Sequence, residues 1–428
     1  MTTRVSVVIP THNRRAMLQR NLQALARQSY PLSQIEIVIV ADGCTDGTEH
    51  VVLKPPLIGR VAVQTHAGAA VARNTGAALA TGDLLLFLDD DVEVWPELVE
   101  AHVRAHSSIS ADALIVGYLQ PRPENTNSLF RIALRSWFET KYERMRQPGH
   151  RFTYADVLTG NCSVPRRFFQ TLNGFQPLLR CHEDYELGLR VLATGGAIGF
   201  APAAGGWHED LSDVGRALQR KRDEGTADVW IAQAHNHVWA VLPLARPAGS
   251  RRSRLLRDFA LNRPLLGGLF DAVARSFLGL LARARLRNRW RAVRDDLLFY
   301  WYWRGVADAL KNTPFDSFRE GITSVLPPPP DLPSVDLQHG LAAAMRELDG
   351  LDAPGVVLHY GGVHVGTIAP QPWAEPLRSC HLRRLLSTTL HAPFADALAT
   401  ARGLGATGSA EAETAGVVVS ATPRAPRQ

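Results

Sequence analysis

The sequence predicts an α/β protein with a parallel sheet near its start, followed by a helical extension and a small α+β module. Two observations favour the sheet. Within the first hundred residues, short apolar runs alternate with helical patterns, and this alternation requires right-handed crossovers between parallel strands. Polar clusters follow the ends of the apolar runs, which is where sheets of this kind bind their ligands.

Length and composition limit the class of protein. The chain has 428 residues, a formal net charge of +6 and 46% hydrophobic residues, as in an ordinary folded protein with two or three domains. Its four cysteines show neither CxxC spacing nor a secreted disulfide framework, so we expect a reducing cytoplasm. The sequence has no apolar signal segment and no run of 18 apolar residues, so we expect no transmembrane helix.

The first elements follow from hydrophobic periodicity. Continuous apolar runs predict buried strands, and apolar residues at helical spacing predict helices. In chain order these are a strand at 5–9, a helix over 14–28, a strand at 35–40, a helix after the turn at 41–48, a strand at 61–63 and a helix over 67–80.

The next strand, over 84–88, ends in three consecutive carboxylates, Asp89, Asp90 and Asp91. Adjacent carboxylates repel one another, so a fold that gathers them is expected to supply a cation. Alternate residues of an extended segment share a face, so Asp89 and Asp91 can serve one site while Asp90 points elsewhere. Oxygen ligands of this kind favour Mg²⁺ or Mn²⁺ shared with a substrate phosphate. The alternative is a solvated acidic loop. A helix start is expected at 95–97.

Four segments then support a family resemblance. In order and spacing, residues 7–14 (VVIPTHNR), 41–48 (ADGCTDGT), 72–76 (ARNTG) and 82–91 (GDLLLFLDDD) resemble the successive motifs of family 2 glycosyltransferases. The resemblance implies the GT-A fold with its Rossmann-like mixed sheet. It also implies a nucleoside-diphosphate sugar donor and inversion at the anomeric carbon.

The resemblance also implies roles for individual residues. Cys44 stands where a Ser is usual in the family. The implied donor-binding residues are Pro10, Thr11 and Asn13 of the first motif, Asp42 beside the base or ribose, Arg73, Asp89 and Asp90. Asp89 and Asp91 match the family's DXD motif. Asp89 and Asp91 are the implied metal ligands.

The second half of the catalytic region contains the expected base. Residues 160–175 resemble the family segment that precedes it, and Glu183 and Asp184 then open a helical pattern. Carboxylates in a first helical turn are stabilised by the helix dipole, which would explain both residues without catalysis. The family's ED motif instead implies that Asp184 is the general base, with Glu183 as its neighbour and the next candidate.

His208 is the third expected metal ligand, because family members often have a His here that contacts the metal or diphosphate; the alternative is a structural histidine. Between the three carboxylates at 89–91 and the segment at 160–175, the sequence predicts a helix near 100–106, a strand near 113–118 and a helix within 125–147. We expect these elements to form the side of the domain that binds the acceptor.

A basic helical segment follows. Between Arg246 and Lys311 there are fifteen Lys and Arg residues and five Asp, a net +10, so the rest of the chain has −4. An amphipathic helix is expected from the apolar residues Leu266, Leu269, Phe270, Val273, Phe277, Leu280 and Leu281, followed by an aromatic cluster at 297–303. This helix either packs on the catalytic domain or meets an anionic membrane. No nucleic-acid-binding motif is present, so we expect no nucleic acid partner.

The predicted organisation has four parts. A GT-A domain over 1–235 precedes the helical region over 236–325, and a proline linker at 327–330 leads to an α+β module over 331–402. Within the module we expect a helix at 341–348, a hairpin at 356–368 and a helix at 382–398, before a disordered tail over 403–428.

These observations predict an inverting glycosyltransferase that uses Mg²⁺ or Mn²⁺. It would transfer a sugar from a UDP- or dTDP-sugar to a hydroxyl acceptor, lipid-linked or glycan, in cell-envelope or polysaccharide synthesis. We expect a cytoplasmic location, including the inner face of the plasma membrane. The rival interpretations are a non-catalytic sugar-nucleotide-binding or membrane-scaffold protein and a nucleotidyltransferase on a similar sheet. Fold alone does not decide among them. An intact general base argues against a binding module, and a nucleotidyltransferase would leave Glu183 and Asp184 unexplained.

Overall fold

A computed structural model describes residues 2–109, 112–122, 128–210, 212–247, 249–263, 266–311, 313–324, 331–351, 353–371 and 373–404. The chain forms two compact units, Met1–Tyr142 with Tyr154–Pro327, and Glu143–Thr153 with Pro328–Gln428. The proline linker predicted at 327–330 lies outside the described residues, as does the predicted disordered tail beyond Leu404.

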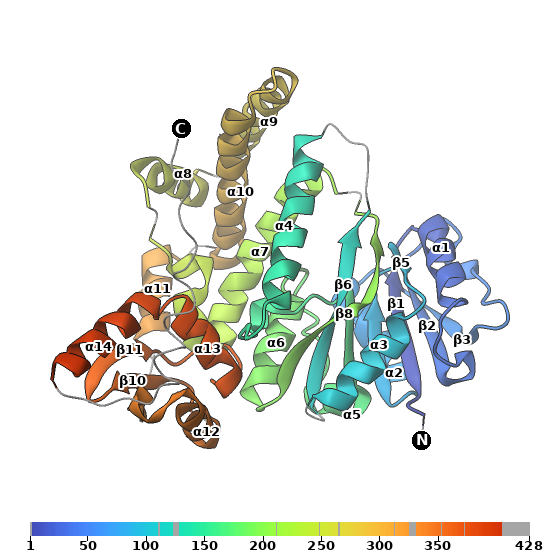
Figure 1. The fold of residues 1–428 in the computed structure, drawn as a ribbon. Coiled ribbons are helices and arrows are strands. Elements are labelled where there is room, and N and C mark those ends of the chain that lie inside the picture. Colours follow the sequence, from blue (N-terminus) through green and yellow to red (C-terminus); the bar gives the residue numbers. More distant parts are fainter. Residues whose placement is uncertain are drawn as a thin grey trace, which may run out of the picture. The chain divides into compact units, whose positions relative to one another are not determined.

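The first unit is built on an eight-stranded mixed sheet, shown in Figure 1. The strands lie in the order β3-β2-β1-β4-β7-β6-β8-β5. Their bounds are β1 Val5–Thr11, β2 Ile35–Asp42, β3 Ile58–Gln64, β4 Leu84–Leu88, β5 Val92–Val94, β6 Ala113–Pro121, β7 Asn161–Pro165 and β8 Ala197–His208. The predicted α/β class with a mixed sheet is therefore confirmed.

The strand register brings the predicted polar clusters to one edge of the sheet. β1 pairs in parallel with β2 and β4, so that Thr11 lies opposite Ala41 and Val8 opposite Phe87. β7 then runs antiparallel to β4. Because β1, β2 and β4 point the same way, the residues that follow them meet at their shared carboxyl end.

Seven helices pack with this sheet or follow its strands. They are α1 Arg15–Leu25, α2 Ala69–Leu79, α3 Leu98–Ser108, α4 Leu129–Arg146, α5 Arg166–Thr171, α6 Glu183–Ala193 and α7 Val214–Ala234. Apolar residues of the central parallel strands β1, β2 and β4 are fully buried, including Val7, Ile37 and Leu86. This continuous core holds the strand ends in fixed positions.

Two local predictions were wrong. The helix expected after Thr48 is a single 3₁₀ turn, Thr48–His50, because Pro55 and Pro56 soon follow and lack the N–H that a helix needs. The segment Val92–Val94 is a short strand, β5, which the sequence analysis missed. It pairs with the end of β8 more than a hundred residues away, and local periodicity does not contain that information.

Four helices form the extension: α8 Arg251–Asn262, α9 Gly267–Arg283, α10 Arg287–Leu310 and α11 Phe315–Thr323. The amphipathic helix was predicted with one apolar face, and the structure divides that face in two. Phe270 and Leu281 of α9 pack in a core with Trp290 and Leu297 of α10. The remaining predicted residues, Leu266, Leu269, Val273, Phe277 and Leu280, are 47% to 68% exposed. Among the described residues, no helix combines the length and hydropathy needed to cross a membrane.

The second unit contains a three-stranded sheet in the order β11-β10-β9, with bounds β9 Ser334–Asp336, β10 Val356–Tyr360 and β11 Val363–Ile368. The predicted hairpin is present, and Gly361 and Gly362 form its turn with positive φ angles. Three helices cover it, α12 Leu341–Leu351, α13 Ser379–Ser387 and α14 His391–Gly403. The single helix predicted over 382–398 is therefore two helices. The break is at Thr388, whose hydroxyl donates to the Arg384 carbonyl (2.6 Å).

Candidate active site

The carboxylates after β4 are bound by residues from the end of β1. The Thr11 hydroxyl donates to Asp90 Oδ2 (2.7 Å), and Arg14 Nη1 lies 3.0 Å from Asp90 Oδ1 and 2.6 Å from Asp91 Oδ2. Burial raises the pKa of Asp90 to about 6, although Arg14 opposes this shift. Asp90 is thus a buried structural contact between the two strand ends, and it does not line the neighbouring cavity.

Arg73 connects the acidic strand end with the helix that begins at Glu183. Its guanidinium donates to Asp89 Oδ1 (2.8 Å) and to Glu183 Oε1 (2.9 Å), and the residue is only 4% exposed. Burial, followed by the charge of Asp184, raises the pKa of Glu183. A buried arginine between two carboxylates fixes their separation, since removing it would leave both charges uncompensated.

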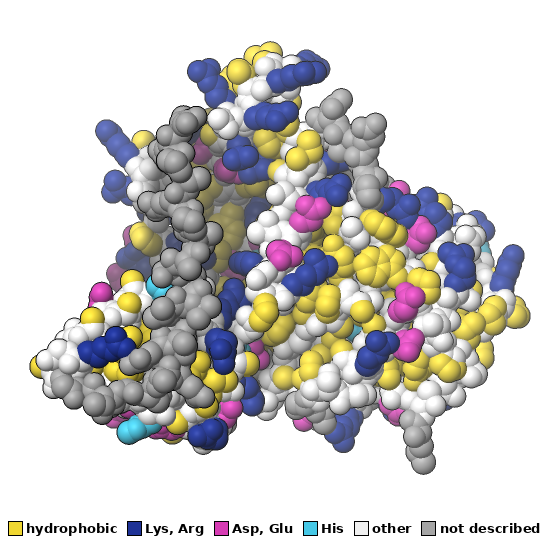
Figure 2. Space-filling model, in the orientation of Figure 1, with side chains coloured by type: hydrophobic (Ala, Val, Ile, Leu, Met, Phe, Trp, Pro, Cys, Tyr) yellow, Lys and Arg dark blue, Asp and Glu magenta, His cyan; other side chains and the backbone are white. Residues whose placement is uncertain are grey.

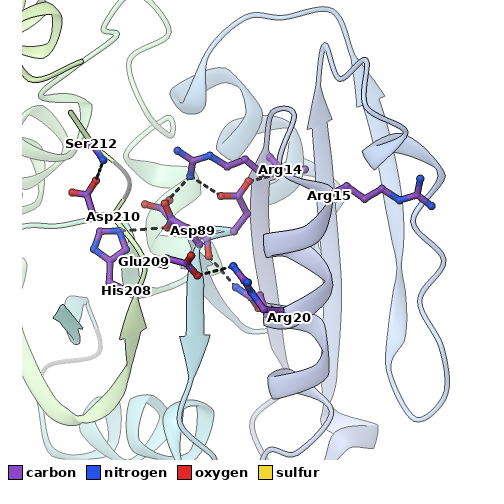
Figure 3. A network of polar contacts seen from close by, with 12 residues as sticks. Arg14, Arg15, Arg20, Asp89, His208, Glu209, Asp210 and Ser212 are labelled. Carbon is purple, nitrogen blue, oxygen red and sulfur yellow. Dashed lines mark hydrogen bonds and ion pairs between the residues drawn. The ribbon is translucent and has the colours of Figure 1, made fainter. Parts of the chain in front are cut away.

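Asp91 faces His208 from the end of β8. Arg14 and His208 both point toward the acidic strand end, where Asp89 is labelled in Figure 3. Asp91 Oδ1 lies 3.4 Å from His208 Nε2. Burial alone would raise the pKa of Asp91, but the contacts with His208 and then Arg14 outweigh it and lower that pKa.

A divalent cation fits between Asp91 and His208. Asp91 Oδ1 is buried and accepts no hydrogen bond that meets ordinary geometric criteria. A carboxylate oxygen and an imidazole nitrogen 3.4 Å apart can both contact one ion, and the carboxylate is a ligand type that Mg²⁺ and Mn²⁺ prefer. Asp89 lines the same cavity and has one oxygen that is not engaged by Arg73.

A second group of ligand atoms is less suited to a metal. One atom each from Cys181, His182 and Glu224 lies within 4.8 Å of the others. However, Lys221 Nζ lies 2.5 Å from Glu224 Oε2, and burial raises the pKa of the Cys181 thiol, which opposes the thiolate form that binds metals. We therefore assign no metal to this group.

The predicted metal and catalytic residues share one cavity of about 460 Å³. The cavity is lined on one side by the strand ends and on the other by the starts of α6 and α7. Its charged lining residues are Arg14, Arg73, Asp89, Asp91, Arg180, His182, Glu183, Asp184, His208, Asp210, Arg216, Arg220 and Asp223. The structure thus brings Asp184, Glu183, Asp89, Asp91, Arg73 and His208 together.

The other predicted donor-binding residues lie along the same sheet edge but do not line this cavity. The Asp42 carboxylate accepts hydrogen bonds from the backbone N–H groups of Ala67 (2.8 Å) and Gly68 (2.9 Å), which help to lower its pKa although burial opposes this. Asn13 Oδ1 accepts from the Thr45 N–H (2.7 Å), and Pro10 immediately precedes Thr11 in β1. These residues form a loop cluster at the carboxyl ends of β1 and β2 and in the loops that follow them.

Sequence analysis missed several charged residues of the cavity. Arg14 directly follows Asn13 in the first motif, so its place in that motif could have identified it. Arg180 and Arg216 line the cavity and have no ion-pair partner among the described residues. No pattern in the sequence pointed to them, because they come from the turn before α6 and from α7.

The mixed sheet has acids at the end of a central strand, and a carboxylate at a helix start lines the same cavity. This is the architecture that the resemblance to GT-A glycosyltransferases implies. The model of the family described as Glycosyl transferase family 2 matches residues 6–172. The match over these residues agrees with the family that the sequence motifs predicted.

Individual relatives agree with this family. A validoxylamine A glucosyltransferase of Streptomyces hygroscopicus subsp. jinggangensis is 33% identical over 224 residues, or 45% of this chain and 52% of that protein. The succinoglycan biosynthesis protein ExoO of Rhizobium meliloti is 28% identical over 312 residues, or 66% of this chain and 86% of that protein. The chain thus spans about half the length of the first of these two.

Among solved structures, a mannosyltransferase from Pyrobaculum calidifontis in complex with GDP-Man and Mn²⁺ aligns with a TM-score of 0.47 and 17% identity. The alignment covers 73% of this chain and 89% of that one.

Proposed function

We propose that this chain is an inverting glycosyltransferase that moves a sugar from a nucleoside-diphosphate donor to a hydroxyl acceptor. The observation that supports this most is the shared cavity, where the acids after β4 face Asp184 at the start of α6. Such a reaction needs one base for the acceptor hydroxyl and positive charge beside the leaving diphosphate. No covalent intermediate is required, so no further nucleophile is needed.

Asp184, rather than Glu183, is the proposed general base. Glu183 is bound by the buried Arg73, whereas the Asp184 carboxylate accepts a hydrogen bond from the adjacent Tyr185 N–H (2.9 Å). A carboxylate without a cationic partner remains free to accept a proton from a substrate. Glu183 instead holds Arg73 in place, and Arg73 in turn orients Asp89.

Asp91, His208 and Asp89 are the proposed holders of Mg²⁺ or Mn²⁺. When bound, such an ion stabilises the negative charge that develops on the diphosphate. Arg180, before α6, and Arg216, on α7, line the same cavity and form no ion pair within the described part of the chain, so they can bind the same anionic group. The loop cluster that contains Pro10, Thr11, Asn13 and Asp42, with Asp90 beneath it, is proposed to receive the nucleoside.

The donor is proposed to be a UDP- or dTDP-sugar, and the acceptor a lipid-linked or glycan hydroxyl in envelope or polysaccharide synthesis. The names of the glucosyltransferase and succinoglycan relatives support a hexose donor and a polysaccharide pathway. A screen of UDP-glucose, UDP-N-acetylglucosamine, dTDP-glucose and GDP-mannose with Mn²⁺ or Mg²⁺ tests this. We expect metal-dependent release of nucleoside diphosphate from at least one donor. Tight binding of a nucleotide sugar without any release would favour the non-catalytic interpretation.

Peripheral attachment to an anionic membrane is also proposed, so that a lipid-linked acceptor would be reached at the inner face of the plasma membrane. The exposed side of α9 has Leu269, Val273, Phe277 and Leu280 at helical spacing. The segment 283–291, from the last residue of α9 to the first turn of α10, contains five exposed arginines and no acid: Arg283, Arg285, Arg287, Arg289 and Arg291. Basic and apolar side chains lie together over this part of α9 and α10 in Figure 2.

Sedimentation with phosphatidylglycerol vesicles tests this attachment. Each arginine near an anionic surface contributes about 1 kcal/mol, so we expect binding at low salt that weakens as salt is added. The double variant Leu269→Glu with Phe277→Glu should remain in the supernatant. Val52→Glu changes an apolar residue that is 75% exposed outside α9, and it should bind like the native chain. Native protein that stays in the supernatant at low salt would contradict the proposal.

A further inference from the structure

The residue before the Glu183–Asp184 pair has an unusual backbone conformation. His182 has φ 59° and ψ 17°, in the left-handed region that residues other than glycine seldom adopt. A strained residue of this kind persists only where its surroundings determine its conformation strongly. The contacts that hold His182 therefore also determine how the chain enters α6.

Those contacts come from α7 and from the helical extension. His182 Nδ1 lies 2.9 Å from Asp228 Oδ1, and the Tyr302 hydroxyl donates to Asp228 Oδ2 (2.6 Å). Asp228 is only 1% exposed. The His182 ring also stacks on Tyr185, with centroids 4.5 Å apart. Burial alone would lower the pKa of His182, but Asp228 outweighs it and raises that pKa, so Nδ1 is held as a donor.

The two helices that supply Asp228 and Tyr302 are packed with little freedom. A Cβ on Gly225 of α7 would lie 2.1 Å from the Tyr302 carbonyl oxygen, and one on Gly305 of α10 would lie 1.8 Å from the Arg222 carbonyl oxygen. Backbones that approach this closely leave no room for sliding. Arg222 Nε also donates to Asp308 Oδ2 across the same interface (2.6 Å). α10 therefore fixes Tyr302 opposite Asp228.

We infer that Tyr302, Asp228 and His182 are positioning residues that aim the Glu183–Asp184 pair into the cavity. The helical extension thus takes part in assembling the site, although Tyr302 lies more than a hundred residues after Asp184. This inference rests on the proposed role of Asp184. It predicts that loosening the chain of contacts slows turnover without weakening donor binding, because none of the three residues is proposed to hold the donor.

Tyr302→Phe and Tyr300→Phe form a matched pair of tests. Both remove one buried hydroxyl from α10, but the Tyr300 hydroxyl has no hydrogen-bond partner among the residues that the structure describes. We expect Tyr302→Phe to lower kcat for hydrolysis of UDP-glucose, or of whichever screened donor reacts, by about tenfold with KM unchanged, since small misplacements of catalytic groups cost large factors in rate. Tyr300→Phe should retain native kcat. Equal kcat in the two variants would overturn the inference.

Asp228→Asn gives a second measurement that does not depend on Tyr302. It should lower kcat at unchanged KM, and it should remove the downfield ¹H NMR signal of His182 Nδ1–H, which Tyr300→Phe should retain. A decrease in thermal stability with native kcat would make the contacts purely structural and would contradict the inference. If the native chain hydrolyses none of the screened donors, the proposed function and this inference both fail. If the native chain hydrolyses a donor and the Tyr302→Phe and Asp228→Asn variants keep the native kcat, the inference fails but the proposed function stands.

Discussion

Asp184→Asn is expected to reduce sugar transfer by about 100-fold or more, the range for loss of a general base. The amide preserves the shape of the side chain but cannot accept the proton of the acceptor hydroxyl. Donor binding and thermal stability should remain native, because Asp184 holds neither the metal nor a buried cation. Steady-state kinetics with the donor found in the screen, together with calorimetric titration of nucleoside diphosphate, would measure both effects.

Asp223→Asn is the matched control for this change. Asp223 lines the same cavity from α7, where it accepts from Gln219 Nε2 (3.0 Å), and it has no proposed role in catalysis. It should retain nearly native turnover. If Asp184→Asn itself transfers sugar at the native rate, another group is the base, and Glu183 would be the next to test.

Asp91→Ala should abolish metal-dependent binding of nucleoside diphosphate. The cation would lose a buried carboxylate ligand, and the diphosphate charge would be left uncompensated. Changes to groups that only support a metal ligand already cost about 10–100-fold in metal affinity, so a loss of about 100-fold or more is expected here. Titration calorimetry with UDP, in the presence and absence of Mn²⁺, measures this directly.

Asp210→Ala serves as the control for Asp91→Ala. Asp210 also lines the cavity, but its carboxylate accepts a hydrogen bond from the Ser212 N–H (2.7 Å) and is not proposed to hold the metal. We expect it to bind UDP with Mn²⁺ at close to native affinity. An Asp91→Ala variant with the same Mn²⁺-dependent affinity as the native chain would remove Asp91 from the metal site.

The core of the catalytic unit could be predicted from sequence because its signals are local and repeated. Apolar runs identify β1, β2 and β4, and the rule that parallel strands share a carboxyl edge places Thr11, Asp42 and Asp89 together. The prediction that Asp89 and Asp91 share a face also agrees with the cavity, which both of them line while Asp90 does not.

What sequence analysis missed depends on contacts between distant segments. The pairing of β5 with β8 and the ion pairs of Arg14 with Asp90 and Asp91 exist only once the sheet has formed. The α9 helix has apolar residues on two sides, and the sequence alone does not decide which side α10 covers. The contact of Tyr302 with Asp228 likewise follows from the crossing of two helices, which no motif encodes.

The central claim is that Asp184 directs a single displacement at the anomeric carbon from within this cavity. The most direct test is ¹H NMR of the first-formed product when the native chain hydrolyses an α-linked donor such as UDP-glucose with Mn²⁺. We predict that the β-anomer appears first and then equilibrates, and that Asp184→Asn suppresses its formation. Initial appearance of the α-anomer would contradict the account, because retention requires a route other than one direct displacement.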